Sequence, residues 1–592
     1  MSEDQIDRSR WRSLEPARCL ASSVTGFCVT MLVVGAVYTL RESARQGWLG
    51  LGYGWLALDL WSRSWELREA LVGALLTLLL ALTGEAFRER RFAPLALLPA
   101  VNRLTSRPWV VAASGLLVLG LPRGAARLAQ PQAPADAQQL LFVMVDTLRA
   151  DHVGWLGYER PTTPLLDELV EGGLVFERVV SSSSWTKPAV ATMLTGLMPS
   201  MHGAVSKGSV RRRASGTAIA PECVTWMEVL RAHGWSTTMW STNPNIVPAN
   251  GFTQGVGRYE SYVDGEQESL DPVRSEVLLA DVRDWLDEQR GESRPFAAYV
   301  HLMDPHWPYV APEPFRGTFD RTGLDLQLDR DLFLQVTVDP AKRSSFTPAM
   351  LERLRAIYDE EILYMDHHLA PFLSSVLEDF PNCLVVLVSD HGEEFLEHGL
   401  LGHSTTVYEE LTRVPLVLWG RAVEPGRVPW QVRLMDIFPT VLEALGVEDP
   451  LPKKAGSARS LFGMEPRDRL APSEVGGDGS PPFQWRAISD GEWKAIRRLP
   501  NSRNAPDGLR EIPVVDEERE SFGFPYDELF HLARDPGERQ DSISENAERA
   551  DALWREMEAR GWYFSQDRVL EFRPSEGGLG ADPELLRALG YL

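Results

Sequence analysis

The stretch "LLFVMVD" (residues 140–146) is a continuous apolar run that ends in an acidic residue. Such a run is typical of a central strand that is covered on both faces of a sheet. Similar runs occur in "SRPFAAYVHLMDPHWPY" (293–309) and "NCLVVLVSDHGEEFLEHG" (382–399), and helix-like segments alternate with them. This alternation predicts an α/β fold, in which a parallel sheet carries helices on both faces.

Polar side chains follow the apolar runs at the points where the predicted strands end. Asp146 ends the first run, and Asp390 and His391 end the third. Thr186 stands at a similar junction in "SSSSWTKPAVATMLTG" (181–196), just before a helix-like segment. Open α/β sheets bind ligands beyond the carboxyl ends of their strands, and carboxylates with an imidazole suit divalent metals. These residues therefore predict a metal site that activates the Thr186 hydroxyl as a nucleophile; the alternative is that the acids are turn residues and the threonine is structural.

Length, charge and cysteine content set limits on the class of protein. A chain of 592 residues predicts two to four domains. The net charge of -23 argues against a nucleic-acid partner, because such proteins need a basic face. Four scattered cysteines predict neither a disulfide framework nor a zinc knuckle.

The first 129 residues have the composition of a membrane region. The segments 20–40, 70–83 and 109–121 are apolar, and arginines flank the first two. Their lengths and flanking charges predict about three transmembrane helices with a cytoplasmic N-terminus. We therefore expect a multi-pass protein of the cell membrane with its catalytic domain periplasmic or extracellular, although an even number of spans would reverse that orientation. Residues 130–139, "QPQAPADAQQ", read as a linker.

The chain beyond this linker resembles the sulfatase family, within the alkaline phosphatase superfamily. The similarity covers Leu140 to Leu592 in order. It is carried by "VDTLRADHVGWLGYERPTTPLLDELVEGGLVFERVVSSSSWTKPAVATMLTGLMPSMHG", "HLMDPHWPY", "YDEEILYMDHHL", "VSDHGEEFLEHGLLGHSTTVYEELTRVPLVLWG", "LMDIFPTVLEALGV", "ELFHLARDPGE" and "LRALGYL". The resemblance implies an alkaline-phosphatase/sulfatase-like parallel-sheet sandwich with a catalytic domain over 140–451. It also implies a small antiparallel sheet with a packed helix in a C-terminal subdomain over 452–592.

The nucleophile segment departs from the usual sulfatase pattern. Typical sulfatases carry Cys or Ser followed by x-Pro-Ser-Arg, and that first residue is oxidised to formylglycine. Here the aligned residues run from Thr186 to Val190, "TKPAV". Threonine is not a substrate for that oxidation, and the supporting arginine is missing. The sulfate-binding Lys-x-His is absent as well, since the corresponding region reads "TTMWSTNPNI" (237–246).

An unmodified threonine is the nucleophile of related phosphodiesterases, phosphoethanolamine transferases and lipoteichoic-acid-synthase-like enzymes. In these relatives an Asp, Thr, Asp and His together hold a metal ion. Carried over position by position, the ligands of this chain are Asp146, Thr186, Asp390 and His391. The resemblance thus implies one divalent cofactor ion, which is Ca, Mn or Zn.

Four further residues are candidates for contact with the substrate. His306 matches the histidine that contacts the ester group in sulfatases, and His403 occupies the position of a leaving-group lysine. An imidazole there would act as a general acid. Lys187 and Asn243 are candidates for binding ester oxygens. The alternatives are loop histidines with satisfied hydrogen bonds, a solvated lysine and a turn asparagine. Three other matched positions are expected to be structural: His202, His398 and Asp436.

Three functions remain compatible with these residues. The first is a membrane-anchored, metal-dependent hydrolase of sulfate or phosphate esters on a small molecule, glycan or lipid. The second is a phosphoethanolamine- or phosphoglycerol-type transferase acting on a lipid or glycan; it differs only in whether an alcohol or water resolves the Thr186 intermediate. The third is an inactive, membrane-tethered binding module. The retained set of four ligands counts against the third, and we predict a hydrolase.

Overall fold

The computed structural model describes the chain from residue 133 to residue 562, with gaps. The described residues are 133–134, 137–205, 218–262, 273–324, 332–333, 335–336, 340–421, 423–451, 456–463, 470–476, 483–500 and 527–562. They belong to one compact unit, Gln132–Leu592. The predicted linker and domain boundaries stay predictions.

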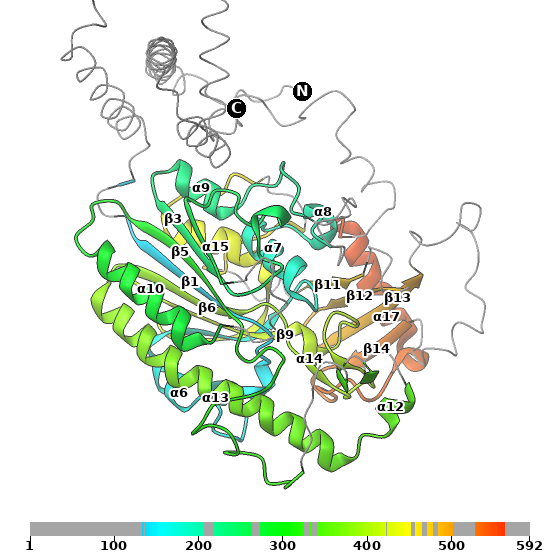
Figure 1. The fold of residues 1–592 in the computed structure, drawn as a ribbon. Helices are drawn as coiled ribbons and strands as arrows, with labels where there is room; N and C mark the ends of the chain where they lie inside the picture. Colours follow the sequence, from blue (N-terminus) through cyan, green and yellow to red (C-terminus); the bar gives the residue numbers. More distant parts are fainter. Residues whose placement is uncertain are drawn as a thin grey trace, which may run out of the picture. The chain divides into compact units, whose positions relative to one another are not determined.

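An eight-stranded sheet is the centre of the described part of the chain (Figure 1). From one edge to the other its strands are β10 (Gly426–Arg433), β2 (Leu174–Val180), β9 (Arg413–Trp419), β6 (Cys383–Ser389), β1 (Gln139–Val145), β5 (Phe296–Leu302), β3 (Ser236–Ser241) and β4 (Arg258–Ser261). All neighbouring pairs are parallel except those that β9 makes with β2 and β6. The predicted parallel sheet is thus a mixed sheet with one reversed strand.

Helices cover both faces of this sheet, which explains why its central strands are apolar throughout. The helices are α6 (Pro164–Leu169), α7 (Thr186–Thr195), α8 (Pro199–His202), α9 (Trp226–Ala232), α10 (Ser275–Gln289), α12 (Pro340–Ser344), α13 (Pro348–Asp379), α14 (Glu409–Thr412), α15 (Ile437–Ala444) and α17 (Ile543–Ala559). One core lies between the sheet and α7, α9 and α15, and the other between the sheet and α6, α10 and α13 (Figure 1). Strands β1, β5 and β6 are buried along almost their whole length because each contributes to both cores.

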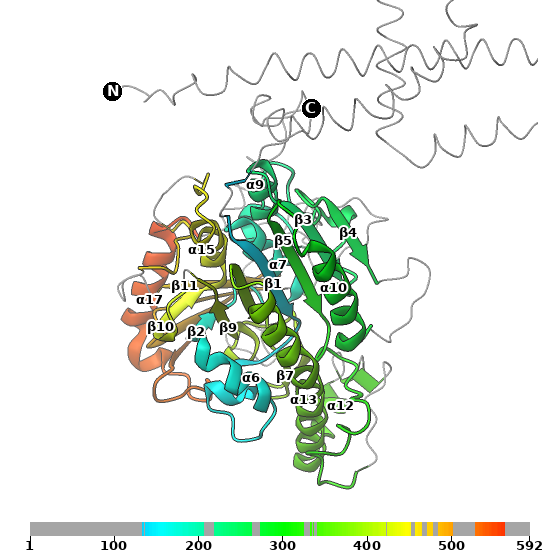
Figure 2. The same cartoon turned by 90° about the vertical axis from the view of Figure 1, so that its left-hand side faces the viewer.

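The predicted small antiparallel sheet is confirmed. Its strands are β11 (Ala471–Val475), β12 (Phe483–Ser489), β13 (Trp493–Pro500) and β14 (Asp527–His531), and all neighbours are antiparallel. Helix α17 lies against this sheet, as both views show (Figures 1 and 2). Its Leu553, Trp554 and Met557 belong to the apolar core of this part of the chain. A short hairpin of β7 (Glu394–Phe395) and β8 (Leu401–Gly402) follows the end of β6.

Helix α13 holds two of the loops that surround the strand ends. The hydroxyl of Tyr358 donates to the carbonyl oxygen of Thr147 at 2.7 Å and accepts from the backbone N–H of Arg149 at 3.0 Å. Three residues further on, the carboxylate of Glu361 accepts from the backbone N–H of Val310 at 2.6 Å. The motif "YDEEILYMDHHL" therefore fixes the loop after β1 and the loop after β5, because one face of α13 supplies the hydrogen-bonding groups of both.

The prediction of a multi-pass protein of the cell membrane is contradicted, and the periplasmic or extracellular position inferred from its spans loses its basis. In the part of the chain that the structure describes, no helix combines the length and the apolar character that crossing a bilayer requires. The longest described helix, α13, carries charged side chains along its length, which are costly in a hydrocarbon environment. The apolar segments behind the prediction, 20–40, 70–83 and 109–121, lie outside the described residues.

Candidate active site

The four residues predicted to bind metal meet at the carboxyl edge of the main sheet. Asp146 directly follows β1, Asp390 and His391 follow β6, and Thr186 is the first residue of α7. The Thr186 hydroxyl lies 3.3 Å from Nε2 of His391 and 3.5 Å from Oδ2 of Asp146. All four side chains are buried. The parallel strand order brings them together, because β1 and β6 are neighbours that end at the same edge.

The serine-rich loop before Thr186 is fixed by backbone hydrogen bonds on two sides. The backbone N–H of Glu474, in β11 of the second sheet, donates to the carbonyl oxygen of Ser182 at 2.9 Å. The backbone N–H of Ser404 donates to the carbonyl oxygen of Ser184 at 2.7 Å. Small side chains allow these two segments to approach the loop closely. The loop therefore presents Thr186 at the start of α7 from a rigid support.

The glycine of the "SDHG" stretch is needed for close packing. A Cβ atom on Gly392 would lie 1.9 Å from the carbonyl oxygen of Glu410, which is far inside van der Waals contact. The backbone N–H of Gly392 donates to the carbonyl oxygen of Leu411 at 2.9 Å. The chain after β6 therefore lies directly against the segment 410–411, and this contact holds Asp390 and His391 in place.

Three ligand atoms face one another at the centre of the site, and two of them are carboxylate oxygens without a hydrogen-bond donor. Oδ1 of Asp146 and Oδ2 of Asp390 are buried and have no hydrogen-bond partner among the described residues. Nδ1 of His391 lies 2.9 Å from the carbonyl oxygen of Gly392, so it carries the proton and leaves a lone pair on Nε2. Nε2 is 3.6 Å from Oδ1 of Asp146 and 3.5 Å from Oδ2 of Asp390.

This donor set fits a divalent cation. Ligand atoms of Asp146, Asp390 and His391 all lie within 4.8 Å of one another. Buried carboxylate oxygens without a donor are costly, and a cation would compensate them. Oxygen and imidazole ligands of this kind suit Mn²⁺ and Zn²⁺.

The pKa values of the two carboxylates also indicate a site for a cation. Burial, and then repulsion by Asp146, raises the pKa of Asp390 well above its ordinary value. Burial alone would also raise the pKa of Asp146, but the hydrogen bond from His301 and the nearby imidazoles lower it below the ordinary range. Without an ion, the pair therefore keeps a proton on Asp390. Burial, and then the proximity of His403, lowers the pKa of His391 to about 3, so its imidazole is neutral, as metal ligation requires.

The two predicted ester-binding residues occupy different positions around the site. The amide nitrogen of Asn243 donates to Oδ2 of Asp146 at 2.6 Å, so this amide is already hydrogen-bonded to the carboxylate of a predicted metal ligand. Lys187 follows Thr186 in α7 and is almost fully buried, with its ammonium nitrogen 5.7 Å from the centroid of the Trp185 ring. A buried positive charge favours an anionic partner.

The predicted catalytic histidines form a cluster with His391. The His403 ring centroid lies 4.6 Å from that of His391 and 5.1 Å from that of His306. Nδ1 of His306 is 2.5 Å from the carbonyl oxygen of Trp307, which leaves its Nε2 for another partner. His403 thus lies beside the metal ligand His391, and His306 lies beside His403. The roles predicted for the two histidines stay predictions.

Two residues of the site were not predicted. Glu393 is fully buried, and its Oε1 lies 2.8 Å from Nδ1 of His403. His301 is fully buried near the end of β5, and its Nε2 lies 3.1 Å from Oδ2 of Asp146. Each had a signal in the sequence: a second acid directly after "SDHG", and a histidine inside the apolar run "FAAYVHL".

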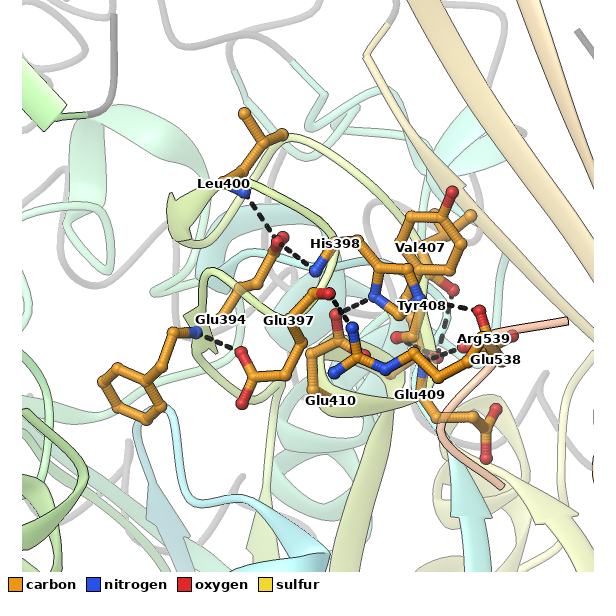
Figure 3. A network of polar contacts seen from close by, with 12 residues as sticks. Glu394, Glu397, His398, Leu400, Val407, Tyr408, Glu409, Glu410, Glu538 and Arg539 are labelled. Atoms are coloured by element: carbon orange, nitrogen blue, oxygen red, sulfur yellow. Dashed lines mark hydrogen bonds and ion pairs between the residues drawn. The ribbon is translucent and has the colours of Figure 1, made fainter. Parts of the chain in front are cut away.

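His398, expected to be structural, belongs to a polar network beside the site (Figure 3). Its Nδ1 is 2.6 Å from the carboxylate of Glu410, and its Nε2 is 2.9 Å from the carbonyl oxygen of Glu538. Its ring stacks on Tyr408 with centroids 3.6 Å apart. The carboxylate of Glu394 accepts from the backbone N–H of His398 at 3.0 Å. This network ties the hairpin after β6 to α14 and to the segment after β14.

The other two residues expected to be structural also bond within the fold. Nδ1 of His202 accepts from the backbone N–H of Ala204 at 3.1 Å, and its Nε2 lies 3.2 Å from the carbonyl oxygen of Pro188. Burial lowers the pKa of His202 to about 3. Asp436 forms a two-pronged ion pair with Arg433 at 2.8 and 2.6 Å.

Comparisons with known proteins agree on the family of this chain. A family model described as Sulfatase matches residues 138–447. N-acetylgalactosamine-6-sulfatase from Canis lupus familiaris is 25% identical, in an alignment that covers 75% of this chain and 89% of the relative. Among solved structures, the phosphonate monoester hydrolase of Agrobacterium radiobacter is similar with a TM-score of 0.56 and 19% identity, covering 74% of this chain and 99% of its own. A putative sulfatase from Bacteroides fragilis has a TM-score of 0.55 and 18% identity, covering 73% and 98%.

Proposed function

The chain belongs to the sulfatase family of ester hydrolases, and on this premise we propose that it hydrolyses sulfate or phosphate esters with the unmodified hydroxyl of Thr186 as its nucleophile. One observation carries the proposal. The Thr186 hydroxyl lies 3.3 Å from Nε2 of His391, beside carboxylate oxygens of Asp146 and Asp390 that have no donor among the described residues. The substrate is a sulfated or phosphorylated small molecule, glycan or lipid.

One divalent ion, of the Ca, Mn or Zn type, is part of this proposal. The ion would be held by Asp146, Thr186, Asp390 and His391, since the oxygen and nitrogen atoms of these side chains face one another. When bound, such an ion supplies positive charge that lowers the pKa of a nearby hydroxyl and stabilises charge on ester oxygens.

The residues around Thr186 orient its attack. Its hydroxyl lies 3.5 Å from Oδ2 of Asp146 and 3.3 Å from Nε2 of His391, which hold it in place. The hydroxyl loses its proton to water, Oγ1 bonds to the phosphorus or sulfur atom of the ester, and the bond to the alcohol breaks as the alcohol takes a proton from His403. A water molecule then attacks the same atom and gives a proton to His403, and the bond to Oγ1 breaks, which returns the free threonine. Lys187, next in α7, provides a positive charge for the non-bridging oxygens.

His403 is the candidate donor of the proton that the departing alcohol needs. Its Nδ1–H donates to Oε1 of Glu393 at 2.8 Å, which leaves Nε2 to carry the transferable proton. Burial alone would raise the pKa of Glu393, but the charge of His403 lowers it, so the carboxylate stays ionised and orients the ring. His306, whose ring packs against His403, is the candidate contact for the ester group.

Replacing His403 with alanine is expected to affect poor leaving groups most. Loss of a general acid lowers kcat/KM by about 10²- to 10⁴-fold for an alkyl ester, whereas a nitrophenyl ester, whose leaving group needs no proton, should lose far less. Steady-state kinetics on a matched alkyl and nitrophenyl pair measures this difference. Glu393→Gln should cause a smaller loss with the same dependence on leaving group. An equal loss on both esters would exclude His403 as the acid.

Phosphate esters are expected to be better substrates than sulfate esters. Hydrated formylglycine expels sulfate by elimination, but a threonyl ester has no such exit and must be hydrolysed at phosphorus or sulfur. In-line attack of water on a threonyl phosphate is the feasible step. The test compares kcat/KM for matched aryl phosphate and aryl sulfate with Ca²⁺, Mn²⁺ or Zn²⁺ added.

A clear preference for the aryl sulfate would overturn the mechanism but not the family. A threonyl phosphate that accumulates and is released only by an added alcohol would instead favour a transferase. The inactive binding module would be favoured if two results were obtained together. No ion would support turnover of aryl phosphates, sulfates, phosphodiesters or phosphonates, and no covalent product would form.

A further inference from the structure

The two carboxylate oxygens of Asp146 have contrasting surroundings. Oδ2 faces three polar groups: Nδ2 of Asn243 at 2.6 Å, Nε2 of His301 at 3.1 Å and the hydroxyl of Thr186 at 3.5 Å. Oδ1 has no hydrogen-bond partner among the described residues and lies 3.6 Å from Nε2 of His391. One oxygen is therefore fully occupied by donors, while the other is turned toward the remaining ligand atoms.

Two of the three groups around Oδ2, those of His301 and Asn243, come from β5 and from the loop after β3. β5 pairs with β1 in parallel, with His301 beside Met144, and β3 pairs with β5, with Ser241 beside His301. Asn243 lies two residues beyond the end of β3. Because the three strands end at the same edge, each brings one polar side chain there: Asp146 directly after β1, His301 near the end of β5 and Asn243 after β3.

The bonding partners determine which nitrogen of His301 carries the proton. Nε2 faces a carboxylate oxygen, which only accepts, so Nε2 bears the hydrogen. Nδ1 lies 3.2 Å from the hydroxyl of Tyr299, two residues earlier on the same face of β5, so this hydroxyl donates to Nδ1. Both side chains are fully buried. Tyr299, His301 and Asp146 thus form a directed chain of hydrogen bonds.

We propose that Tyr299, His301 and Asn243 are positioning residues that hold Oδ2 of Asp146 and thereby aim Oδ1 at the divalent cation. The inference rests on the proposed metal site. A carboxylate held by two directional donors has lost its freedom to rotate before the cation binds, so less entropy is lost on binding. Outer hydrogen bonds of this kind also set the orientation and basicity of metal ligands. The chain should therefore tune the affinity for the cation rather than the chemistry of the ester.

The experiment is calorimetric titration of the full-length, chelator-stripped protein with Mn²⁺ alone. His301→Leu is expected to raise the Kd for Mn²⁺ by about 10- to 100-fold. His301→Gln, whose amide can replace the Nε2 donor, should recover most of this affinity. Tyr299→Phe removes only the hydroxyl and should weaken binding by less than His301→Leu does.

The matched control is His152→Leu. His152 is also buried and also paired with a carboxylate, that of Asp359 at 2.6 Å, but Asp359 belongs to α13 and is not a metal ligand. His152→Leu should lower thermal stability and leave the Kd for Mn²⁺ unchanged. A merely structural role of His301 would give the same result as this control.

The outcomes separate this inference from the proposed function. Wild-type protein that binds no Mn²⁺ would refute the metal site and the positioning role together. Wild-type binding that is lost in Asp390→Ala but unchanged in His301→Leu and Tyr299→Phe would refute the positioning role alone. Weaker binding in His301→Leu that His301→Gln does not restore would also refute it, because the donor hydrogen bond would not be the cause.

Discussion

Replacing Thr186 with alanine is expected to lower kcat by on the order of 10⁴- to 10⁶-fold, the usual cost of removing a catalytic nucleophile. The reason is that alanine has no oxygen with which to form the covalent ester, while the surroundings of the site stay intact. Metal affinity should only weaken, because Asp146, Asp390 and His391 remain. Steady-state kinetics on an aryl phosphate and titration with Mn²⁺ measure the two effects separately.

Two further variants test whether the effect belongs to the hydroxyl at this position. Thr186→Ser keeps the oxygen and should retain part of the turnover. Thr195→Ala removes another buried hydroxyl from the same helix, one that donates to the carbonyl oxygen of Ala191 at 2.7 Å; its turnover should match wild type. Mass spectrometry of quenched wild-type protein should find the transferred group on Thr186. Near-normal turnover in Thr186→Ala would place the nucleophile elsewhere.

The sheet could be predicted from the sequence where its strands are apolar and end in polar residues. The runs "LLFVMV" and "CLVVLVS" lie in β1 and β6, and both strands are covered on two faces, as continuous apolar runs require. The reversal of β9 could not be predicted, because "RVPLVLW" would serve equally well in either direction. Its direction is set by its neighbours β2 and β6, to both of which it is antiparallel.

The site was predictable to the extent that its residues follow strand ends or match family motifs. Asp146, Thr186, Asp390 and His391 could be assigned in this way, and the structure brings them together. The contacts of His301 and Asn243 with Asp146 could not, because they depend on β1, β5 and β3 being neighbours. Three other strands, β2, β3 and β4, lie between β1 and β5 in the sequence, and sequence order does not specify that β1 and β5 are neighbours in the sheet.

Asp390→Asn is expected to abolish cation binding and, at the same time, to stabilise the metal-free protein at neutral and alkaline pH. The pKa of Asp390 is raised well above its ordinary value by burial and then by the charge of Asp146. A group whose pKa is higher in the folded than in the unfolded protein contributes its full stability at pH values below the pKa in the unfolded protein, about 3.9 for Asp. That contribution is lost as the pH rises through the pKa in the folded protein, because the folded state must then release a proton from a buried site beside another carboxylate.

Asparagine removes this pH dependence while keeping the useful hydrogen bonds. Oδ1 of Asp390 accepts from the backbone N–H of His391 at 2.9 Å and of Thr147 at 3.3 Å, and an amide oxygen would accept from both. Oδ2 has no donor among the described residues, so its replacement by an amide nitrogen breaks no hydrogen bond there. We expect the free energy of unfolding of the metal-free protein to rise by about 0.5–2 kcal/mol, as is common when a destabilising group is removed from a functional site. Wild-type protein should recover this difference only when an ion is added.

Thermal unfolding in excess chelator at pH 5 and pH 8, with Mn²⁺ titration alongside, measures both effects. The difference in Tm between Asp390→Asn and wild type should be larger at pH 8 than at pH 5. Asp366→Asn is the control, since burial raises the pKa of Asp366 to about 7, while both of its oxygens accept from backbone N–H groups of α6. That variant should lose stability and keep cation binding. Tight binding of Mn²⁺ by the Asp390→Asn protein would exclude Asp390 as a ligand. Lower stability than wild type at both pH values would show that repulsion between the two free carboxylates does not destabilise the metal-free protein.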